Sequence, residues 1–193
     1  MERFYTIQGE GFHSGRPAYF IRLGGCEVGC VWCDVKQSWD ASAHPVRSIE
    51  SLLQEALQYP SRFLVITGGE PAQYDLRPLC RLFHENGFEI AIETSGAYPL
   101  VAEADWICVS PKKFKAPLRE VMQAADELKV VVYHKSDFSW AEENAVQVSP
   151  DCRLYLQPEY SRFDEQIAAI IDYVKAHPRW KISLQTHKII DVP

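Results

Sequence analysis

The chain has 193 residues, of which 47% are hydrophobic and 24% are charged, and this suits one compact domain over residues 1–193 with a sizeable core. A disordered chain, a collagen and a tandem-repeat array are excluded. The 20 basic residues are spread along the chain against 26 acidic ones, giving a net charge of −6. The sequence therefore shows no electrostatic footprint for a nucleic-acid backbone, and we expect a small-molecule substrate.

Short apolar runs with helical stretches between them predict buried strands. The strands are expected at 18–23, 63–68, 89–95, 105–110, 127–133, 152–158 and 181–186. Their continuous hydrophobicity is typical of parallel strands that are covered on both faces. Apolar residues at helical spacing predict helices over 48–58, 75–86, 118–125, 140–145 and 162–176. Ser48 and Asp75 are expected to cap two of these helices, and Gly87 to end one.

The repeated strand-helix pattern predicts an α/β fold that resembles a TIM barrel. The chain is short of the ~250 residues of a closed barrel, so we expect an incomplete, trimmed barrel with reduced helix content. Residues 4–12 would precede the core strands, and a last strand within 181–193 would deliver Pro193 to the site. Such folds bind their ligands on the loops after the carboxyl ends of the strands.

Localisation determines how the cysteines are interpreted. No apolar stretch approaches the roughly 20 residues of a membrane span, and the first residues do not resemble a signal peptide, so we expect a cytoplasmic protein. Six cysteines in a reducing compartment are not expected to form disulfides. Cys80, Cys108 and Cys152 lie in or beside apolar runs and are expected to pack in the core.

The other cysteines lie together in GGCEVGCVWCD, after the first strong strand. Cys26, Cys30 and Cys33 have the spacing Cys-x₃-Cys-x₂-Cys, and three thiolates on one tight loop can hold three irons of a [4Fe–4S] cluster. A zinc site requires a fourth ligand, and the next candidates, Asp34 and His44, fit closed tetrahedral spacing poorly. Packing alone gives no reason to crowd three cysteines together.

This spacing, with Trp32 just before the third cysteine, resembles the fingerprint of the radical S-adenosylmethionine (SAM) superfamily. The resemblance implies that the open iron binds SAM and that electron transfer cleaves SAM to a 5′-deoxyadenosyl radical. The segment TGGEP (67–71) is similar to the superfamily's GGE motif, where Gly69 would allow close approach and Glu70 would meet the SAM ammonium group. Taken alone, this segment would be an ordinary turn.

Three further predicted strands end in polar segments: ETSG, SPKK and LQPEYS. Glu93, Ser110 and Gln157 would therefore lie at the mouth of the barrel, where a polar ligand can be held. Each of them could instead be only a cap or a turn.

The segment FYTIQGEGFHSGRPAYFIRLGGCEVGCVWCD (4–34) resembles the radical SAM family of 7-carboxy-7-deazaguanine synthases, which act in queuosine and 7-deazapurine biosynthesis. The resemblance continues through TGGEP, ETSG, SPK, LQPE and LQTHKIIDVP. It implies a lyase that converts 6-carboxy-5,6,7,8-tetrahydropterin into 7-carboxy-7-deazaguanine by radical ring contraction with loss of ammonia. SAM would be used catalytically.

Two features suit such a substrate. The QGEG segment (8–11) offers an amide, a carboxylate and flexible backbone to the edge of an aminopyrimidinone ring, or forms a glycine-rich turn. Arg22 lies inside the apolar run FIRL, where an unpaired guanidinium would be costly, so a carboxylate partner is expected. That partner is a buried Asp or Glu or, as the resemblance implies, the substrate carboxylate.

The resemblance implies three sets of site residues. Cluster ligands would be Cys26, Cys30 and Cys33. Contacts with SAM would come from Trp32, Gly69, Ser110, Pro111, Lys112, Leu156, Gln157, Pro158 and Glu159. Substrate contacts would come from Ile7, Gln8, Gly9, Arg22, Thr67, His187 and Pro193. No side chain is expected to act as a catalytic nucleophile, because the radical comes from SAM at the cluster.

One position departs from the family pattern. After the third cysteine and its Asp the family usually has a threonine that helps to hold Mg²⁺, but Val35 stands here and offers no side-chain oxygen. We therefore expect weak or absent dependence on Mg²⁺. The resemblance also implies a flavodoxin- or ferredoxin-type electron donor and a homodimer. Two other functions stay open: an activating enzyme for a glycyl-radical partner, and a non-catalytic zinc-binding module.

Overall fold

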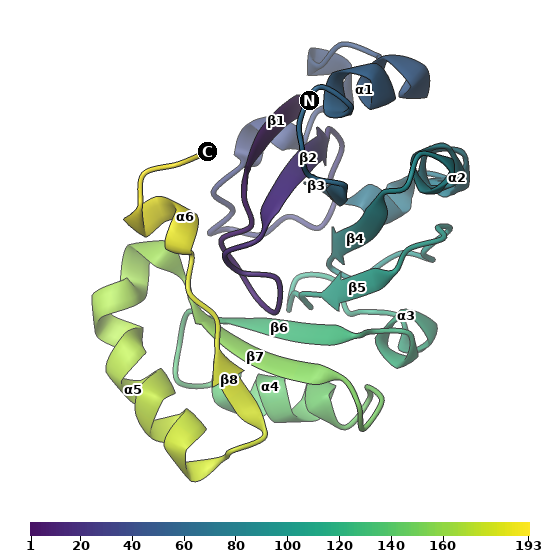
Figure 1. Ribbon diagram of the computed structural model, residues 1–193. Helices are drawn as coiled ribbons and strands as arrows, with labels where there is room; N and C mark the ends of the chain where they lie inside the picture. The colour runs from purple at the N-terminus through teal and green to yellow at the C-terminus, as the bar shows by residue number, and fades with distance from the viewer.

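The computed structural model describes residues 1–193 and arranges eight strands in one curled sheet (Figure 1). The strands follow one another across the sheet in chain order: β1 Glu2–Ile7, β2 Pro17–Leu23, β3 Phe63–Gly68, β4 Glu89–Thr94, β5 Trp106–Val109, β6 Glu127–Val132, β7 Arg153–Pro158 and β8 Trp180–Ile182. Strand β1 is antiparallel to β2, and all other neighbours are parallel. The predicted α/β fold with an incomplete barrel is confirmed.

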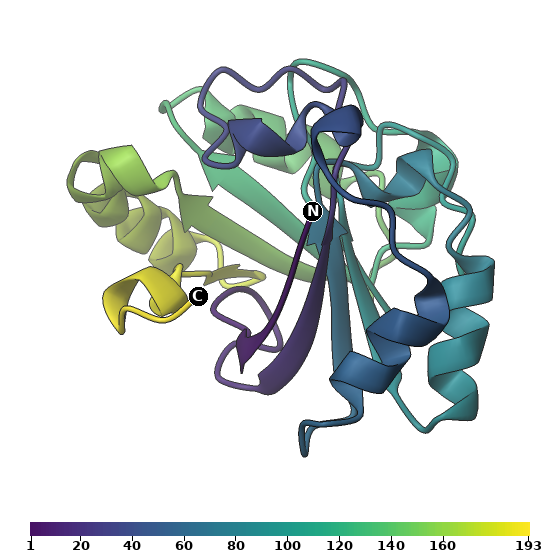
Figure 2. The same ribbon diagram turned by 90° about the horizontal axis from the view of Figure 1, so that it is seen from above.

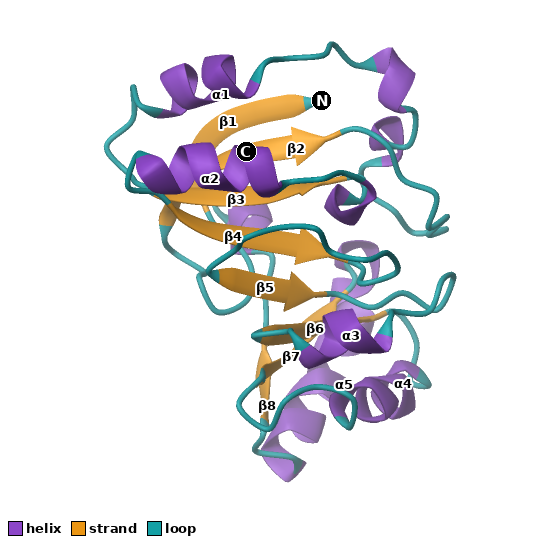
Figure 3. Ribbon diagram, turned by 90° about the vertical axis from the view of Figure 1, so that its right-hand side faces the viewer, coloured by secondary structure: helices purple, strands orange, loops and turns teal.

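The helices cover the outer face of the sheet (Figures 2 and 3). They are α1 Ile49–Ala56, α2 Arg77–Glu85, α3 Arg119–Gln123, α4 Asp137–Ala145 and α5 Phe163–Ala176, whereas the short helix α6 Thr186–Ile189 contacts the loop after β1. The Ser48 side chain accepts a hydrogen bond from the Ser51 amide, as expected of an N-cap. Asp75 is not the N-cap of α2, because Leu76 takes that position while the Asp75 carboxylate binds Arg77. No helix is long and apolar enough to cross a membrane.

Two apolar clusters lie between the sheet and its helices. One joins β2, β3 and β4 to α1 and α2 and contains Cys80, and the other joins β5, β6 and β7 to α3, α4 and α5 and contains Cys152. Both cysteines therefore pack in the core, as predicted. Cys108 is buried too, but it belongs to neither cluster, because its neighbours in register on β4 and β6 are Glu93 and Glu127.

The inner face of the sheet changes character along the strands. Towards the amino ends it is apolar, with Phe20, Val65 and Ala91 in one small cluster. Two residues further along β2 and β4 stand Arg22 and Glu93, which face the same way because side chains alternate with a period of two. An apolar plug therefore closes the bottom of the barrel beneath a polar upper layer.

Strands β1 and β8 do not pair, so the barrel has a seam, which we define as the gap between them. Hydrogen bonds from the loop after β1 span it. The Gly11 amide donates to Ser183 Oγ over 2.9 Å, and the Thr186 amide donates to the Gly9 carbonyl over 2.9 Å. The prediction of a strand over 181–186 is wrong at its end, since β8 stops at Ile182 and α6 turns to dock on this loop.

Candidate active site

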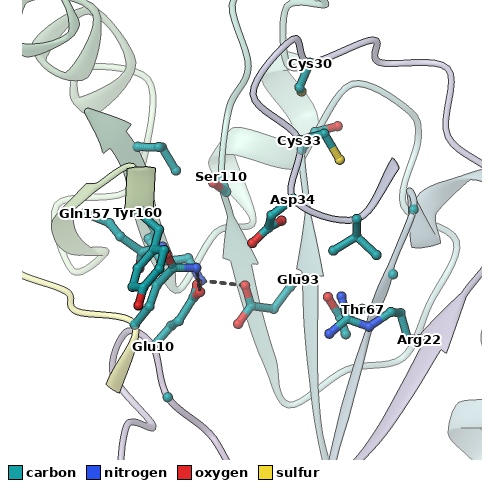
Figure 4. A pocket seen from close by; sticks show the side chains of 18 of the residues that line it. Glu10, Arg22, Cys30, Cys33, Asp34, Thr67, Glu93, Ser110, Gln157 and Tyr160 are labelled. Carbon is teal, nitrogen blue, oxygen red and sulfur yellow. Dashed lines mark hydrogen bonds and ion pairs between the residues drawn. The ribbon is translucent and has the colours of Figure 1, made fainter. Parts of the chain in front are cut away.

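A pocket of about 470 Å³ opens at the carboxyl ends of the strands (Figure 4). Its wall includes most of the residues that the sequence singled out: Ile7, Gln8, Gly9, Arg22, Cys26, Cys30, Trp32, Cys33, Thr67, Gly69, Ser110, Lys112, Gln157, Pro158, Glu159, His187 and Pro193. Pro111 and Leu156 do not line it. Leu156 is fully buried in the apolar cluster of β5, β6 and β7. Alternate residues of β7 face opposite sides of the sheet, and Gln157 takes the inward position.

The three clustered cysteines carry free thiols on one wall of the pocket. Cys30 is buried, and its burial raises the pKa of its thiol to about 11; burial also raises the pKa of Cys26. No three His, Cys, Asp or Glu side chains are close enough together to hold a single metal ion. A four-iron cluster suits this donor set, because each iron takes its own thiolate, whereas zinc needs four ligands around one ion.

The TGGEP turn supports the cysteine loop through its backbone. The Gly69 amide donates to the Leu23 carbonyl over 2.9 Å, and the Glu70 amide donates to the Gly25 carbonyl over 2.8 Å. A Cβ at Gly69 would lie 2.2 Å from the Gly25 oxygen. The glycine therefore permits close approach of the cysteine loop, whereas the sequence motif suggested close approach of SAM.

The Glu70 carboxylate has a different role from the one expected. It is buried and accepts hydrogen bonds from the Thr94 hydroxyl over 2.5 Å and from the amides of Ala72 and Ser95 over 3.0 and 2.8 Å. The Ser95 hydroxyl also donates to it. These donors occupy both oxygens, so the carboxylate ties the turn to the end of β4 and is not free to receive an ammonium group.

Gly69→Ala is expected to disturb the cysteine loop. The added methyl group meets backbone on the opposite side, which cannot move aside as a flexible side chain would. We expect a loss of about 1–3 kcal/mol in stability, as for other overpacked sites, and lower iron content after reconstitution. Gly15→Asn is the control: Gly15 stands in open space, so this variant adds only the backbone strain of a positive φ, which is smallest for asparagine among side chains. Equal iron content in both variants would contradict this role.

Arg22 lies on the inner face of β2, in register with Glu2 of β1 and Thr67 of β3. Its Nε is 3.0 Å from Glu2 Oε2, but the two groups are not aligned for a hydrogen bond, and Nε is buried without a partner. The Glu2 side chain is 49% exposed. Glu2 is therefore only a poorly aligned partner for the guanidinium of Arg22. Arg22 and Thr67 lie together in the pocket (Figure 4).

Lys112 lies in the segment that follows β5, beside the cysteine loop. Its Nζ donates to the carbonyl and to the hydroxyl of Ser110, each over 2.6 Å, and lies 5.7 Å from the centre of the Trp32 ring. Burial lowers the pKa of Lys112. The polar end of this strand thus places one ammonium group on the wall that carries the thiols.

A buried cation in the pocket was not predicted from the sequence. Lys129 has a side chain only 3% exposed, and its Nζ donates to Glu10 Oε2 over 2.5 Å and to Glu93 Oε2 over 2.6 Å. Figure 4 shows Glu10 and Glu93 directed towards one another inside the pocket. The signal was present, because Lys129 interrupts the apolar run ELKVVVY just as Arg22 interrupts FIRL.

Comparisons with known proteins agree with this geometry. Residues 20–125 match the model of the radical SAM superfamily. The chain is 49% identical to the 7-carboxy-7-deazaguanine synthase of Flavobacterium psychrophilum, covering 100% of this chain and 91% of the relative, and 46% identical to that of Synechocystis sp., covering 99% and 91%. The crystal structure of QueE from Escherichia coli superposes with a TM-score of 0.83 at 35% identity, covering 95% of this chain and 91% of that one.

Together, the cysteine loop on a barrel wall, the strand order and the likeness along the whole chain lead to one conclusion. The chain belongs to the 7-carboxy-7-deazaguanine synthase family of the radical SAM superfamily.

Proposed function

We propose that the chain is a radical SAM lyase that converts 6-carboxy-5,6,7,8-tetrahydropterin into 7-carboxy-7-deazaguanine and ammonia, within queuosine and 7-deazapurine biosynthesis. One observation carries the proposal: the three thiols and the Arg22 guanidinium line the same pocket. A cluster and a carboxylate-bearing substrate can therefore meet there. The names of relatives that match over the full chain support it.

Different residues of the pocket lining are proposed to hold the cluster, the substrate and SAM. Cys26, Cys30 and Cys33 would hold the cluster, and when bound, the cluster and SAM supply the one-electron chemistry that begins at a substrate C–H bond. Arg22 binds the substrate carboxylate, because its guanidinium has only a misaligned partner and pairs well with a planar anion. Side-chain contacts with SAM are proposed for the lining residues Trp32, Ser110, Lys112, Gln157, Pro158 and Glu159, together with the backbone at Gly69.

Most of the other proposed substrate contacts lie at the seam. Ile7, Gln8 and Gly9 end β1 and start its loop, and His187 of α6 packs against Gly9, where a Cβ would lie 2.1 Å from His187 Nδ1. These residues, with Thr67 and Pro193, are proposed to surround the pterin. One continuous sheet over the whole chain supports a single radical SAM domain of residues 1–193.

We also propose a flavodoxin- or ferredoxin-type electron donor and a homodimeric assembly, as the family membership implies. Cys26 and Cys33 are partly exposed residues. A protein donor can therefore approach a cluster held at this loop.

Anaerobic reconstitution with iron and sulfide tests the proposed function. We expect a brown protein with about four irons per chain that cleaves SAM under reduction and forms 7-carboxy-7-deazaguanine once the carboxylated pterin is added. A colourless protein that binds zinc would favour the zinc-binding module. SAM cleavage without any conversion of the pterin would favour an activating enzyme.

Mg²⁺ is expected to have little effect on turnover. Val35 lines the pocket without a side-chain oxygen, and the neighbouring Asp34 carboxylate already accepts a hydrogen bond from Lys188 Nζ over 2.8 Å. We expect product formation to change less than about twofold between a chelator and saturating Mg²⁺, since this cation requires several oxygen ligands. Val35→Thr is the matched variant and should gain stimulation. A large, saturable requirement in the unmodified chain would contradict this expectation.

A further inference from the structure

A lysine held between two carboxylates lies deep in the pocket. Lys129 on β6 donates to Glu10, from the loop after β1, and to Glu93 at the end of β4. The second oxygen of each carboxylate accepts from an amide: Gln185 Nε2 reaches Glu10 over 2.8 Å, and Gln8 Nε2 reaches Glu93 over 3.0 Å. The loop after β1, the end of β4, strand β6 and the segment before α6 are thus joined in one hydrogen-bond network around the Lys129 ammonium group.

Other titratable groups face this triad from the neighbouring elements. They are Cys108 on β5, Lys112 after that strand, Glu127 on β6, His187 on α6 and His13 in the loop after β1. Burial raises the pKa of Cys108 well above its ordinary value and raises the pKa of Glu127, while it lowers the pKa of Lys112, His13 and His187. All these shifts favour the neutral form of the group, and Lys129 is the cation in direct contact with Glu10 and Glu93.

The lysine lowers the pKa of one of its partners. Burial by itself would raise the pKa of Glu10, but the charge and the hydrogen bond of Lys129 lower it to about 2. Without this cation, withdrawal from water would favour the protonated form of Glu10. The charge of Lys129 therefore keeps Glu10 a full acceptor in the pocket.

Both carboxylates keep acceptor capacity for a ligand. An ionised carboxylate offers about four lone-pair sites, and each of these two uses one oxygen for Lys129 and the other for an amide. Glu10 and Glu93 also line the pocket. A ring that presents several N–H donors, such as an aminopyrimidinone, is the chemical class that fits such a surface.

We propose that Lys129 is a positioning residue for the substrate: its charge and its two hydrogen bonds hold Glu10 and Glu93 so that they accept hydrogen bonds from the N–H groups of the pterin ring. This inference rests on the proposed function. It assigns to the lysine no contact with the reacting atoms.

Three substitutions separate charge from structure. Lys129→Gln keeps hydrogen-bond donors but removes the charge, Lys129→Met removes both, and Lys129→Arg keeps the charge. Lys181→Met is the control, because Lys181 is exposed on β8 and lies outside the pocket. Each reconstituted protein is assayed for iron content, for SAM cleavage without substrate, and for kcat and KM with the carboxylated pterin across pH 6 to 9.

We expect the Gln and Met variants to keep their cluster and their substrate-free SAM cleavage, while KM rises at least about tenfold, as for loss of a hydrogen bond to a charged group. Their kcat/KM should fall further as the pH is lowered, because protonation removes an acceptor. His187 titrates in all the proteins, so the ratio of variant to unmodified chain isolates this effect. In the Arg variant, kcat/KM should depend on pH below neutrality as it does in the unmodified chain.

A Gln variant with the KM and pH profile of the unmodified chain would overturn the inference, since donors without charge would then suffice. If the Met variant does not fold, the Gln and Arg variants still decide the question. Failure of the proposed function would look different, because the unmodified chain itself would then neither bind nor convert the carboxylated pterin.

Discussion

Cys33→Ala is expected to abolish turnover completely. The thiol is one of three on the cysteine loop, and a [4Fe–4S] cluster with only two protein ligands is not retained. We expect the iron content after anaerobic reconstitution to fall from about four to less than about one per chain. SAM cleavage should fall below detection with it. Iron analysis and the visible absorbance of the cluster provide the measurement.

Cys152→Ala is the matched control for this loss. Cys152 is buried in the apolar cluster of β5, β6 and β7 and does not line the pocket. Its truncation should therefore cost about 1 kcal/mol of stability and leave the iron content unchanged. If both variants lost iron equally, the assignment of the cysteine loop would be wrong. If neither lost iron, the cluster would have to be held elsewhere.

Arg22→Ala is expected to weaken substrate binding strongly while the cluster stays intact. A charge-assisted pair between a guanidinium and a carboxylate contributes about 3 kcal/mol when it is sheltered from water, which corresponds to roughly a 100-fold rise in KM. Substrate-free SAM cleavage should persist, because Arg22 lies on β2 and holds no iron. Steady-state kinetics and equilibrium binding of the carboxylated pterin give the numbers.

Two further variants sharpen the Arg22 test. Arg3→Ala removes a neighbouring guanidinium of β1 that pairs with Glu55 over 2.6 Å and does not line the pocket. It should leave KM unchanged. Arg22→Lys retains the charge but not the two-pronged geometry, so an intermediate KM is expected. Normal affinity in Arg22→Ala would remove the residue from the substrate site.

The strands and the cysteine loop could be predicted because their signals are local. A continuous apolar run is sufficient to predict a buried parallel strand, and three closely spaced cysteines on one loop are typical of an iron–sulfur cluster. Arg22 was found in the same way, as a charge inside an apolar run. Leu156 was misplaced because matching a motif does not say which face of β7 each residue takes.

Other features depend on contacts between distant segments, which a sequence pattern does not contain. The Glu70 carboxylate is occupied by donors from β4 that lie more than 20 residues away. The triad of Lys129, Glu10 and Glu93 joins three elements across the barrel. Helix α6 exists because it docks on the loop after β1, and its own four residues contain no strong helical signal.

The seam between β1 and β8 has a consequence for how such chains vary in length. Within a ladder, inserting a single residue shifts the register and turns every following side chain to the opposite face. The seam has no ladder; hydrogen bonds of the Gly9 carbonyl and the Gly11 amide span it. Residues can therefore be added or removed in the segments that border the seam, between β1 and β2 and between β8 and α6, without reversing the inward side chains of either strand.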